Sequence, residues 1–430
     1  MHRAPAGARG LPRLLDGRVS RVYVLGGHQT DFARNWSRGG EGLFEMLGAA
    51  VRGALEASRV RPDEVEVGHV GNFTGELFAG QGHLGGFFAS LHPDLAGVPA
   101  SRHEAACASG SIALLAAMSE LEAGRYEVAC VAGVEQMRNV PGQQAADHLG
   151  AAAWRGREGQ GATYLWPAMF DRLAREYDER HGLAYDDLMA LSRQAFANGS
   201  RNPRAQSRAW TFTDRSFTAD DVANPVVEGW MRRQDCGQIT DGAAAVVLAS
   251  ERWARDWAAR EGVDLGAVPF VAGWGHRTAP MLMEDKLVAS RGQRWVFPEL
   301  RRTLEDAWRR AGVAGPEAVD AFEVHDCFSI TQYMVLDHLG LEGLVEGVAP
   351  GRPGAAIAET GADGRFPVNP SGGLIGGGHP VGATGVRMLH DAAQQVRGLA
   401  DGVQVDGARR AQTLNLGGSS TTTVSFVVER

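Results

Sequence analysis

Two segments of the chain follow the same pattern, and this internal likeness limits the folds that it can adopt. Residues 53–73 ("GALEASRVRPDEVEVGHVGNF") and 306–328 ("DAWRRAGVAGPEAVDAFEVHDCF") each run from a helix pattern through a turn of small residues and an acidic residue into a strand that ends in polar residues. A repeated unit of this kind indicates duplication, and its helix–strand order is typical of layered α/β folds. The sequence therefore predicts two similar α/β halves.

Further hydrophobic patterns complete both halves. In the first half they predict helices at 43–58 and 110–124 and strands at 21–27, 65–73, 126–135 and 241–250. In the second half they predict helices at 298–313 and about 383–398 and strands at 268–275, 318–328, 412–418 and 422–429. The helix at 110–124 is apolar nearly all round at its start, so we expect it to be buried.

These patterns divide the chain into an N-terminal half, 21–265, and a C-terminal half, 266–430. Residues 136–240 are rich in Gly, Arg, Trp, Asp and Asn and interrupt the first half, so they are predicted to be an inserted, mostly helical loop domain. Residues 1–20 are basic but lack the apolar run of a signal peptide, and we expect a flexible arm.

Composition excludes several classes of protein. The net charge is −8 with no long basic run, so no nucleic-acid partner is expected. No apolar run approaches the length of about 18 residues that a membrane span needs. The four cysteines are far apart and show no CxxC spacing, which indicates neither a metal site nor a disulfide framework. We expect a cytoplasmic protein with reduced thiols.

A stretch of unusual glycine content surrounds one histidine. Residues 369–385, "NPSGGLIGGGHPVGATG", hold seven glycines around His379. Glycine loses much chain entropy on ordering, but it lets the backbone approach a ligand closely. A lone histidine is more often structural than catalytic, and the glycines favour the catalytic interpretation here.

Cys107 lies just before the predicted buried helix, in "HEAACASGSIALLAAM" (103–118). Backbone N–H groups at a helix start stabilise a thiolate, and the small residues around Cys107 leave room for a substrate. The alternative, an inert buried thiol, is equally open from placement alone.

"EVHDCFS" (323–329) places His325, Asp326 and a second thiol, Cys327, at a strand end, where α/β sheets carry their chemistry. A satisfied structural network is the alternative for this stretch. Together with Cys107 and His379, these residues suit covalent acyl transfer, in which a thiolate attacks a carbonyl carbon and imidazoles manage the protons.

Several motifs resemble those of thiolases. "CASGSIAL" (107–114) resembles the thiolase nucleophile segment, and "NPSGGLIGGGHPVGATGVR" (369–387) resembles the glycine-rich C-terminal signature. Segments 23–34, 131–137, 202–207 and 235–251 match thiolase segments in the same order, so the resemblance covers about residues 20–430. "HDCF" (325–328) resembles the sterol-carrier-protein-2 type of thiolase.

The resemblance implies an α-β-α-β-α layered fold with an inserted loop domain, and it implies roles for individual residues. Cys107 would carry the acyl group, and His379 would activate that thiol and help to bind a thioester oxygen. His325 takes the place of an asparagine that, in the family, holds a water in the first oxyanion hole. The backbone N–H groups of Cys107 and Gly417 would form the second oxyanion hole.

One departure from the commoner family pattern concerns the second catalytic cysteine. Asn415 stands where many thiolases have that cysteine, in "TLNLGGS" (413–419). An amide does not titrate, so Cys327 is predicted to be the acid/base, with its pKa lowered by His325 and His379.

The implied activity is acyl transfer between coenzyme A thioesters, either thiolysis of a 3-oxoacyl-CoA or Claisen condensation, as in an acetyl-CoA C-acyltransferase of lipid metabolism. Coenzyme A thioesters would be substrates, and no cofactor or metal is expected. The family is oligomeric, so we expect a homodimer or homotetramer, with an OB-fold protein as a further candidate partner. The adenine nucleotide of coenzyme A is expected to rest on residues 136–240, with 161–170 as a candidate pocket wall.

Other functions were weighed against this one. "GQGHLG" (80–85), with Glu104 about twenty residues later, matches a dinucleotide-binding pattern of an NAD-dependent dehydrogenase, but a lone match is weak and no strand leads directly into it. A thiolase-like retro-aldolase or an acyl-CoA-binding protein would keep the fold, but such proteins usually lack the nucleophile pattern.

Overall fold

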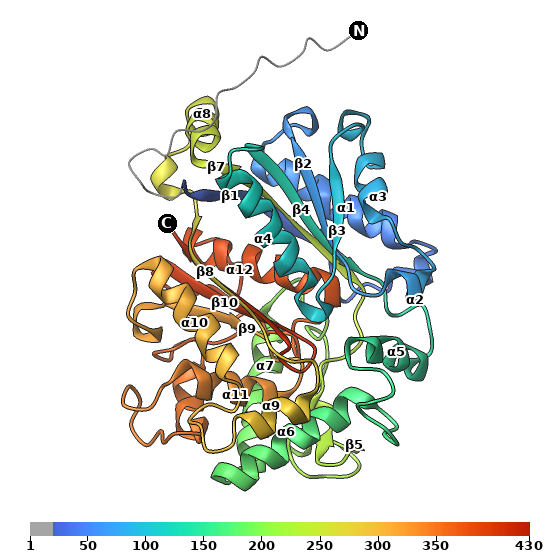
Figure 1. The fold of residues 1–430 in the computed structure, drawn as a ribbon, viewed down its shortest axis with the longest axis vertical. Coiled ribbons are helices and arrows are strands. Elements are labelled where there is room, and N and C mark those ends of the chain that lie inside the picture. Colours follow the sequence, from blue (N-terminus) through green and yellow to red (C-terminus); the bar gives the residue numbers. More distant parts are fainter. Residues whose placement is uncertain (1–19) are drawn as a thin grey trace.

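The computed structural model describes residues 20–430, so nearly all of the predicted N-terminal arm lies outside the described residues. A nine-stranded sheet runs through this part of the chain in the order β3-β2-β4-β7-β1-β8-β11-β10-β9 (Figure 1). Its strands are β1 Val22–Gln29, β2 Val67–Gly71, β3 Ala100–His103, β4 Val128–Glu135, β7 Gly242–Ser250, β8 Phe270–Thr278, β9 Ala321–Val324, β10 Arg410–Gly417 and β11 Thr422–Glu429.

The sheet consists of two half-sheets with the same pairing pattern. In the first, β1, β7 and β4 pair antiparallel, and β4, β2 and β3 pair parallel. In the second, β8, β11 and β10 pair antiparallel, and β10 and β9 pair parallel. Only two residue pairs, Val22 with Val271 and Tyr23 with Phe270, join the half-sheets. The two similar halves predicted from the sequence are therefore confirmed.

Five layers result from the way the helices cover these half-sheets. The helices are α1 Leu43–Ser58, α2 Gly75–Ala79, α3 Leu84–Ser90, α4 Ser109–Glu122, α8 Glu251–Glu261, α9 Met283–Ala289, α10 Pro298–Ala311, α11 Ser329–Leu339 and α12 Thr384–Arg397. α4 and α12 share one apolar core with strands of both half-sheets, and they lie side by side in the centre of Figure 1. α1 and α8 cover the outer face of the first half-sheet, and α10 and α11 that of the second. The chain has the α-β-α-β-α arrangement expected for its fold class.

The central layer depends on close approach between backbones. A Cβ atom added at Gly110 would lie 2.8 Å from the Gly382 carbonyl oxygen, and one added at Gly133 would lie 2.3 Å from the same atom. Real Cβ atoms do not tolerate such distances, so both positions require glycine. The loop before α12 can therefore rest directly on the start of α4. This contact brings the glycine-rich motif next to the nucleophile motif.

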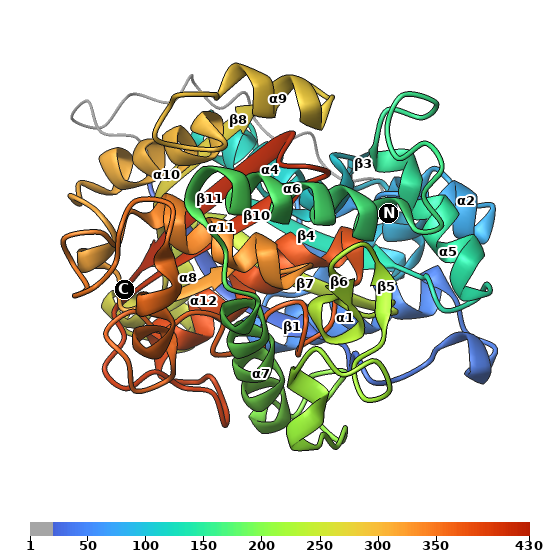
Figure 2. The same cartoon turned by 90° about the horizontal axis from the view of Figure 1, so that it is seen from below.

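The region between β4 and β7 is mostly helical, as predicted. It contains α5 Gly142–Leu149, α6 Leu165–His181, α7 Tyr185–Arg201 and a short hairpin of β5 Val226–Glu228 and β6 Met231–Arg232. α6 and α7 pack against the fully buried α11 (Figure 2). The boundaries of this inserted region and of the two halves stay predictions.

Some local expectations were wrong. The strand predicted at 318–328 is β9, Ala321–Val324, so His325, Asp326 and Cys327 lie beyond its end. Among residues 20–430, no helix is both long and apolar enough to cross a membrane.

Candidate active site

Cys107 sits on a tight turn between β3 and α4. The turn is a 3₁₀ segment, Ala106–Ala108, in which Ala106 has a positive φ of 51°. This left-handed conformation costs a non-glycine residue about 1–2 kcal/mol. Hydrogen bonds from the Ala106 N–H to Glu104 Oε1 (2.6 Å) and from Ser109 Oγ to the Ala106 carbonyl (2.6 Å) hold it. The strained turn presents the Cys107 thiol to a cavity.

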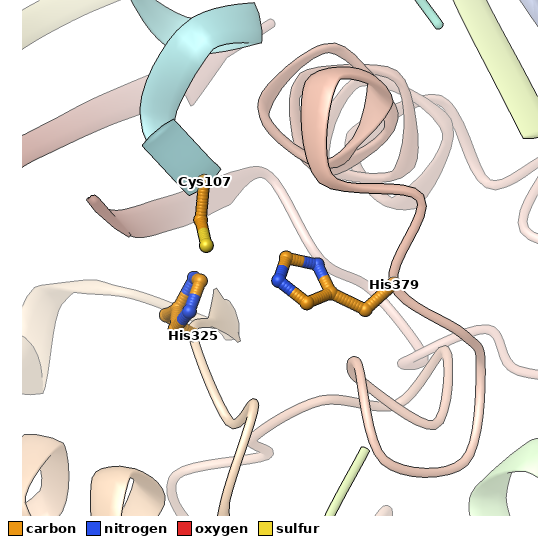
Figure 3. Close-up of side chains that lie close together, drawn as sticks. All are labelled: Cys107, His325 and His379. Atoms are coloured by element: carbon orange, nitrogen blue, oxygen red, sulfur yellow. The ribbon is translucent and has the colours of Figure 1, made fainter. Parts of the chain in front are cut away.

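His325 and His379 lie beside this thiol (Figure 3). Their rings are perpendicular, at 89°, with centroids 5.3 Å apart. One ring nitrogen of each histidine and Cys107 Sγ all lie within 4.8 Å of one another. Three segments far apart in the sequence therefore meet at one point, as the sequence analysis assumed when it combined them.

A hydrogen-bond chain sets the tautomer of His379. Thr384 Oγ1 donates to the Pro380 carbonyl at 3.0 Å and lies 2.7 Å from His379 Nδ1. Because the only proton of this hydroxyl is engaged, Thr384 accepts from Nδ1–H. Nε2 is then the unprotonated nitrogen, and a neutral imidazole in this tautomer can remove a proton from Cys107.

His325 is oriented by a residue that was assigned no role in the sequence analysis. Its Nδ1 lies 3.1 Å from Asn415 Oδ1, and Asn415 Nδ2 donates to Ser111 Oγ at 3.0 Å. The Leu416 N–H also lies 3.4 Å from His325 Nδ1. The shorter contact with the amide oxygen favours the tautomer in which Nδ1–H donates to Asn415 and Nε2 is unprotonated. Asn415 thus lies against His325, and it anchors that ring to the start of α4.

Cys327 lines the same cavity, and Asp326 beside it in sequence bonds to the glycine-rich loop. Asp326 Oδ1 accepts a hydrogen bond from the Leu374 N–H at 2.6 Å, so this carboxylate holds the glycine-rich loop. Thr331 Oγ1 lies 3.9 Å from Cys327 Sγ.

Burial controls protonation throughout the site. It raises the pKa of the Cys107 thiol to about 12, against the smaller effect of a hydrogen bond from the Gly418 backbone. Burial also raises the pKa of Cys327 well above its usual value. The pKa of His325 falls to about 4 and that of His379 falls well below its usual value, for the same reason. The expected lowering of both thiol pKa values is wrong in the unliganded site, because desolvation outweighs the helix start and the neutral imidazoles.

The turn between β10 and β11 completes this side of the site. Gly417 ends β10, where an added Cβ would lie 2.3 Å from the Ala105 carbonyl oxygen, and Gly418 bonds to Cys107 through its backbone N–H. Lys286, which the sequence analysis missed, donates from Nζ to Ser419 O (2.6 Å), Ser419 Oγ (2.8 Å) and Thr421 Oγ1 (3.0 Å). Burial lowers the pKa of this lysine to about 7. No local sequence signal marks it, because its partners lie over 130 residues away.

The cavity in front of Cys107 has a volume of about 310 Å³. Its walls are largely apolar, and Trp166, Phe170 and Phe328 form a row with ring centroids 6.0 and 4.5 Å apart. Tyr164, Trp166 and Phe170 belong to the stretch 161–170, which therefore is a pocket wall. Polar atoms enter from Cys107, Cys327, His379, Gly418, Arg233 and Gln238.

The rejected dinucleotide pattern has the wrong surroundings for such a site. Residues 80–83 connect α2 to α3, and residues 84–85 begin α3, so the pattern links two short helices and does not lead from a strand into a helix. A dinucleotide-binding turn needs the strand–turn–helix context, because the pyrophosphate rests on that helix start.

Comparisons with known proteins agree with this geometry. The thiolase N-terminal domain model matches residues 22–206, and the model "Thiolase C-terminal domain-like" matches residues 283–430. The acetyl-CoA acetyltransferase of Methanothermobacter thermautotrophicus is 31% identical over 412 residues, which are 95% of this chain and 99% of that protein. The chain belongs to the thiolase family.

The other relatives carry several different names. Human sterol carrier protein 2 is 27% identical over 93% of this chain and 70% of its own length. Two solved structures share the fold: an Ltp2-ChsH2(DUF35) aldolase (TM-score 0.73, 19% identity, 95% of this chain and 97% of that one) and the acetyl-CoA acetyltransferase from Syntrophomonas wolfei (TM-score 0.68, 18% identity, 96% and 100%). The thiolase family predicted from the sequence motifs is confirmed.

The raised pKa of Cys107 predicts an unusual pH profile for its alkylation. With a pKa of about 12, the thiolate fraction and the iodoacetamide rate should rise roughly tenfold per pH unit from pH 7 to 10, whereas an ordinary thiol of pKa about 8.5 levels off. Peptide mass spectrometry resolves Cys107 from the other thiols, and Cys107→Ala is the control. A rate that levels off below pH 8 would show that the helix start outweighs burial.

Proposed function

We propose that this thiolase transfers acyl groups between coenzyme A thioesters through a thioester formed on Cys107. The observation that carries the proposal is the Cys107 thiol facing the unprotonated Nε2 of His379 at the end of an apolar cavity. A thiol and a neutral base in a desolvated pocket suit attack on a thioester or ketone carbonyl. Relatives named acetyl-CoA acetyltransferase support this reaction class.

In the thiolysis direction, the proton on Cys107 passes to His379 Nε2 as sulfur bonds to the C3 carbonyl carbon of a 3-oxoacyl-CoA. His379 Nε2–H then donates a hydrogen bond to the C3 oxygen, which becomes negative when sulfur adds. An unprotonated Nε2 could not donate this bond. Cleavage of the C2–C3 bond leaves the acyl group on Cys107, and the carbanion at C2 takes a proton from Cys327. Coenzyme A then attacks the thioester, and its thiol proton restores Cys327. The second acyl-CoA leaves, and the released Cys107 sulfur takes back its proton from His379 Nε2.

The high pKa of Cys327 fits this direction. A thiol that stays protonated at neutral pH is ready to act as an acid in the bond-cleaving step. Its thiolate, once formed, is a strong base for the coenzyme A thiol or, in Claisen condensation, for an α-carbon. Cys327 is therefore the proposed acid/base because its pKa is raised, whereas the sequence analysis expected a lowered pKa.

The walls of the cavity indicate how the substrate is held. The apolar volume of about 310 Å³ lined by aromatic side chains accommodates acyl groups larger than acetyl. Arg233 is exposed beside the cavity and belongs to the region expected to carry the nucleotide of coenzyme A, so it is a candidate contact for a phosphate. We expect coenzyme A and its thioesters as the small-molecule partners, with no cofactor.

A retro-aldolase or an acyl-CoA-binding protein remains the second candidate, since an aldolase shares the fold. A cleavage assay separates them: a thiolase consumes free coenzyme A and forms two acyl-CoA products from a 3-oxoacyl-CoA. We also propose that the protein forms a homodimer or homotetramer. Its four free cysteines are in keeping with a cytoplasmic location. An OB-fold protein is a further proposed partner, like the DUF35 component that the aldolase structure names. Size-exclusion chromatography with light scattering tests the oligomer.

The acyl-enzyme is tested directly on Cys107. Incubation with an acyl-CoA followed by peptide mass spectrometry should place the acyl group on this residue, because it is the thiol beside an available base. Cys107→Ala should abolish turnover. A label on another residue, or unimpaired turnover in the variant, contradicts the proposal.

The orientation of His379 is tested by a pair of substitutions. Replacing the histidine, in His379→Asn, should lower the rate about 100–1000-fold. Thr384→Val removes the acceptor for Nδ1–H and should cost a hydrogen bond of about 0.5–1.5 kcal/mol, or roughly 2–10-fold in kcat/KM. Thr384→Ser keeps the hydroxyl and is the matched control. Equal rates for the Val and Ser variants would contradict the tautomer assignment.

The role of Cys327 is tested by separating the two half-reactions. We expect Cys327→Ser to acylate Cys107 from an acyl-CoA and then to fail in condensation with a second one, because a serine hydroxyl is too weak an acid and base. Cys236→Ser, another thiol at the cavity wall, should lose far less. Rapid-quench measurements resolve both steps. Normal rates of both steps in Cys327→Ser would move the role to the surroundings of Asn415.

A further inference from the structure

The three groups that meet at the reactive thiol also form a set of metal ligands. Cys107 Sγ and one nitrogen each of His325 and His379 lie within 4.8 Å of one another. A tetrahedral zinc ion with Zn–S of about 2.3 Å and Zn–N of about 2.0–2.1 Å separates its ligand atoms by roughly 3.3–3.6 Å. Small rotations of the three side chains therefore suffice to bring the atoms around one ion.

The hydrogen bonds behind the two rings match those of ligating histidines. A metal-bound histidine usually donates its other N–H to a neighbouring acceptor, which orients the ring and exposes the lone pair. His379 donates from Nδ1 to Thr384 Oγ1, and His325 lies with Nδ1 3.1 Å from Asn415 Oδ1. In each ring, one nitrogen lies on the side of Cys107 (Figure 3).

The donor set selects the kind of ion. One sulfur and two imidazole nitrogens suit borderline-soft ions such as Zn²⁺ and Co²⁺, whereas Mg²⁺ and Ca²⁺ prefer oxygen ligands. The fourth position faces the cavity, where water or a substrate atom can occupy it. His325 supplies the second imidazole of the set, beside His379.

We propose that Cys107, His325 and His379 bind one Zn²⁺ ion and that this ion reversibly blocks acyl transfer by occupying the Cys107 sulfur. The S–H bond of Cys107 breaks, its proton goes to solvent, and a Zn–S bond forms, while the two imidazoles bind through their lone pairs. No oxidation or reduction takes place. The site thus has two exclusive states, a free thiol that reacts with thioesters and a zinc-bound thiolate that does not.

One other histidine cluster could compete for the ion. His69 Nδ1 lies 2.9 Å from His103 Nε2, and His69 Nε2 lies 3.2 Å from Glu120 Oε2. These nitrogens already bond to one another, so a metal would have to break that contact. The cluster lacks a thiol, and this difference gives the experiment its readout.

Cobalt is the probe for the first experiment, because a Co²⁺–thiolate bond produces a charge-transfer band in the near ultraviolet. Metal-free full-length protein is titrated with CoCl₂ and, by calorimetry, with ZnCl₂. We expect one ion per chain with the thiolate band, no band in Cys107→Ala, and Zn²⁺ affinity at least about tenfold weaker in His325→Asn. His103→Asn is the control for the competing cluster and should bind as the unmodified chain does.

The outcomes separate the sites. A band that persists in Cys107→Ala, or zinc affinity unchanged in His325→Asn, overturns the proposal. Loss of the band in Cys327→Ser with full binding in His325→Asn would assign the ion to the two thiols, which also overturns it. Circular dichroism verifies folding, and His379→Asn tests the same ligand set if another variant does not fold. Because the readout is binding, it does not depend on the proposed acyl transfer.

The blocking effect has its own measurement. Where the protein turns over a 3-oxoacyl-CoA, Zn²⁺ should inhibit it at the concentration range found by calorimetry, and excess chelator should restore the full rate. Inhibition that persists after chelation, or full activity with zinc bound, contradicts the two exclusive states.

Discussion

The buried carboxylate of Glu135 joins the segments on which the geometry of the site depends. It ends β4 and accepts hydrogen bonds from the Phe73 N–H (2.9 Å), Asn72 Nδ2 (2.8 Å) and the Gly382 N–H (3.0 Å). The loop before α12 is thereby held on the end of the first half-sheet, at the place where Gly110 allows it to touch α4. The bond with Glu135 and the contact with Gly110 both hold Gly382, and this common anchor brings His379 next to Cys107.

Desolvation gives the site its chemical character. His325 is buried, and the two thiols and His379 are half-buried at the cavity wall. Desolvation makes each group prefer its neutral form, so the resting site holds protons and lone pairs rather than ions. Charge would develop only when a carbonyl carbon is attacked, and the neutral His379 would then receive the proton that stabilises the resulting oxygen. The same lone pairs beside a thiol make the site a candidate for a thiophilic ion, so acyl transfer and metal binding would compete for one sulfur atom.

Much of the fold could be predicted, because strand and helix periodicity is written along the chain. The helix predicted at 43–58 has the bounds of α1, and the strands of both half-sheets were found with small shifts. β3 was missed because it is short and half exposed at the sheet edge, and α11 because a helix buried on all sides has no polar face to mark it. Glu135 and Lys286 could not be found, since their partners come from distant segments.

The sequence by itself determined the elements, the duplication and the identity of the reactive groups, since these depend on residue types and on spacing within short stretches. Only the tertiary structure decided how those groups are protonated and oriented. Asn415 lies 90 residues from His325 and 304 residues from Ser111, yet it connects them. Asp326 is next to Cys327 in sequence, yet it bonds to Leu374 in the glycine-rich loop. Hydrogen bonds and desolvation depend on which atoms the folded chain packs around a group, and neighbours in sequence do not specify that.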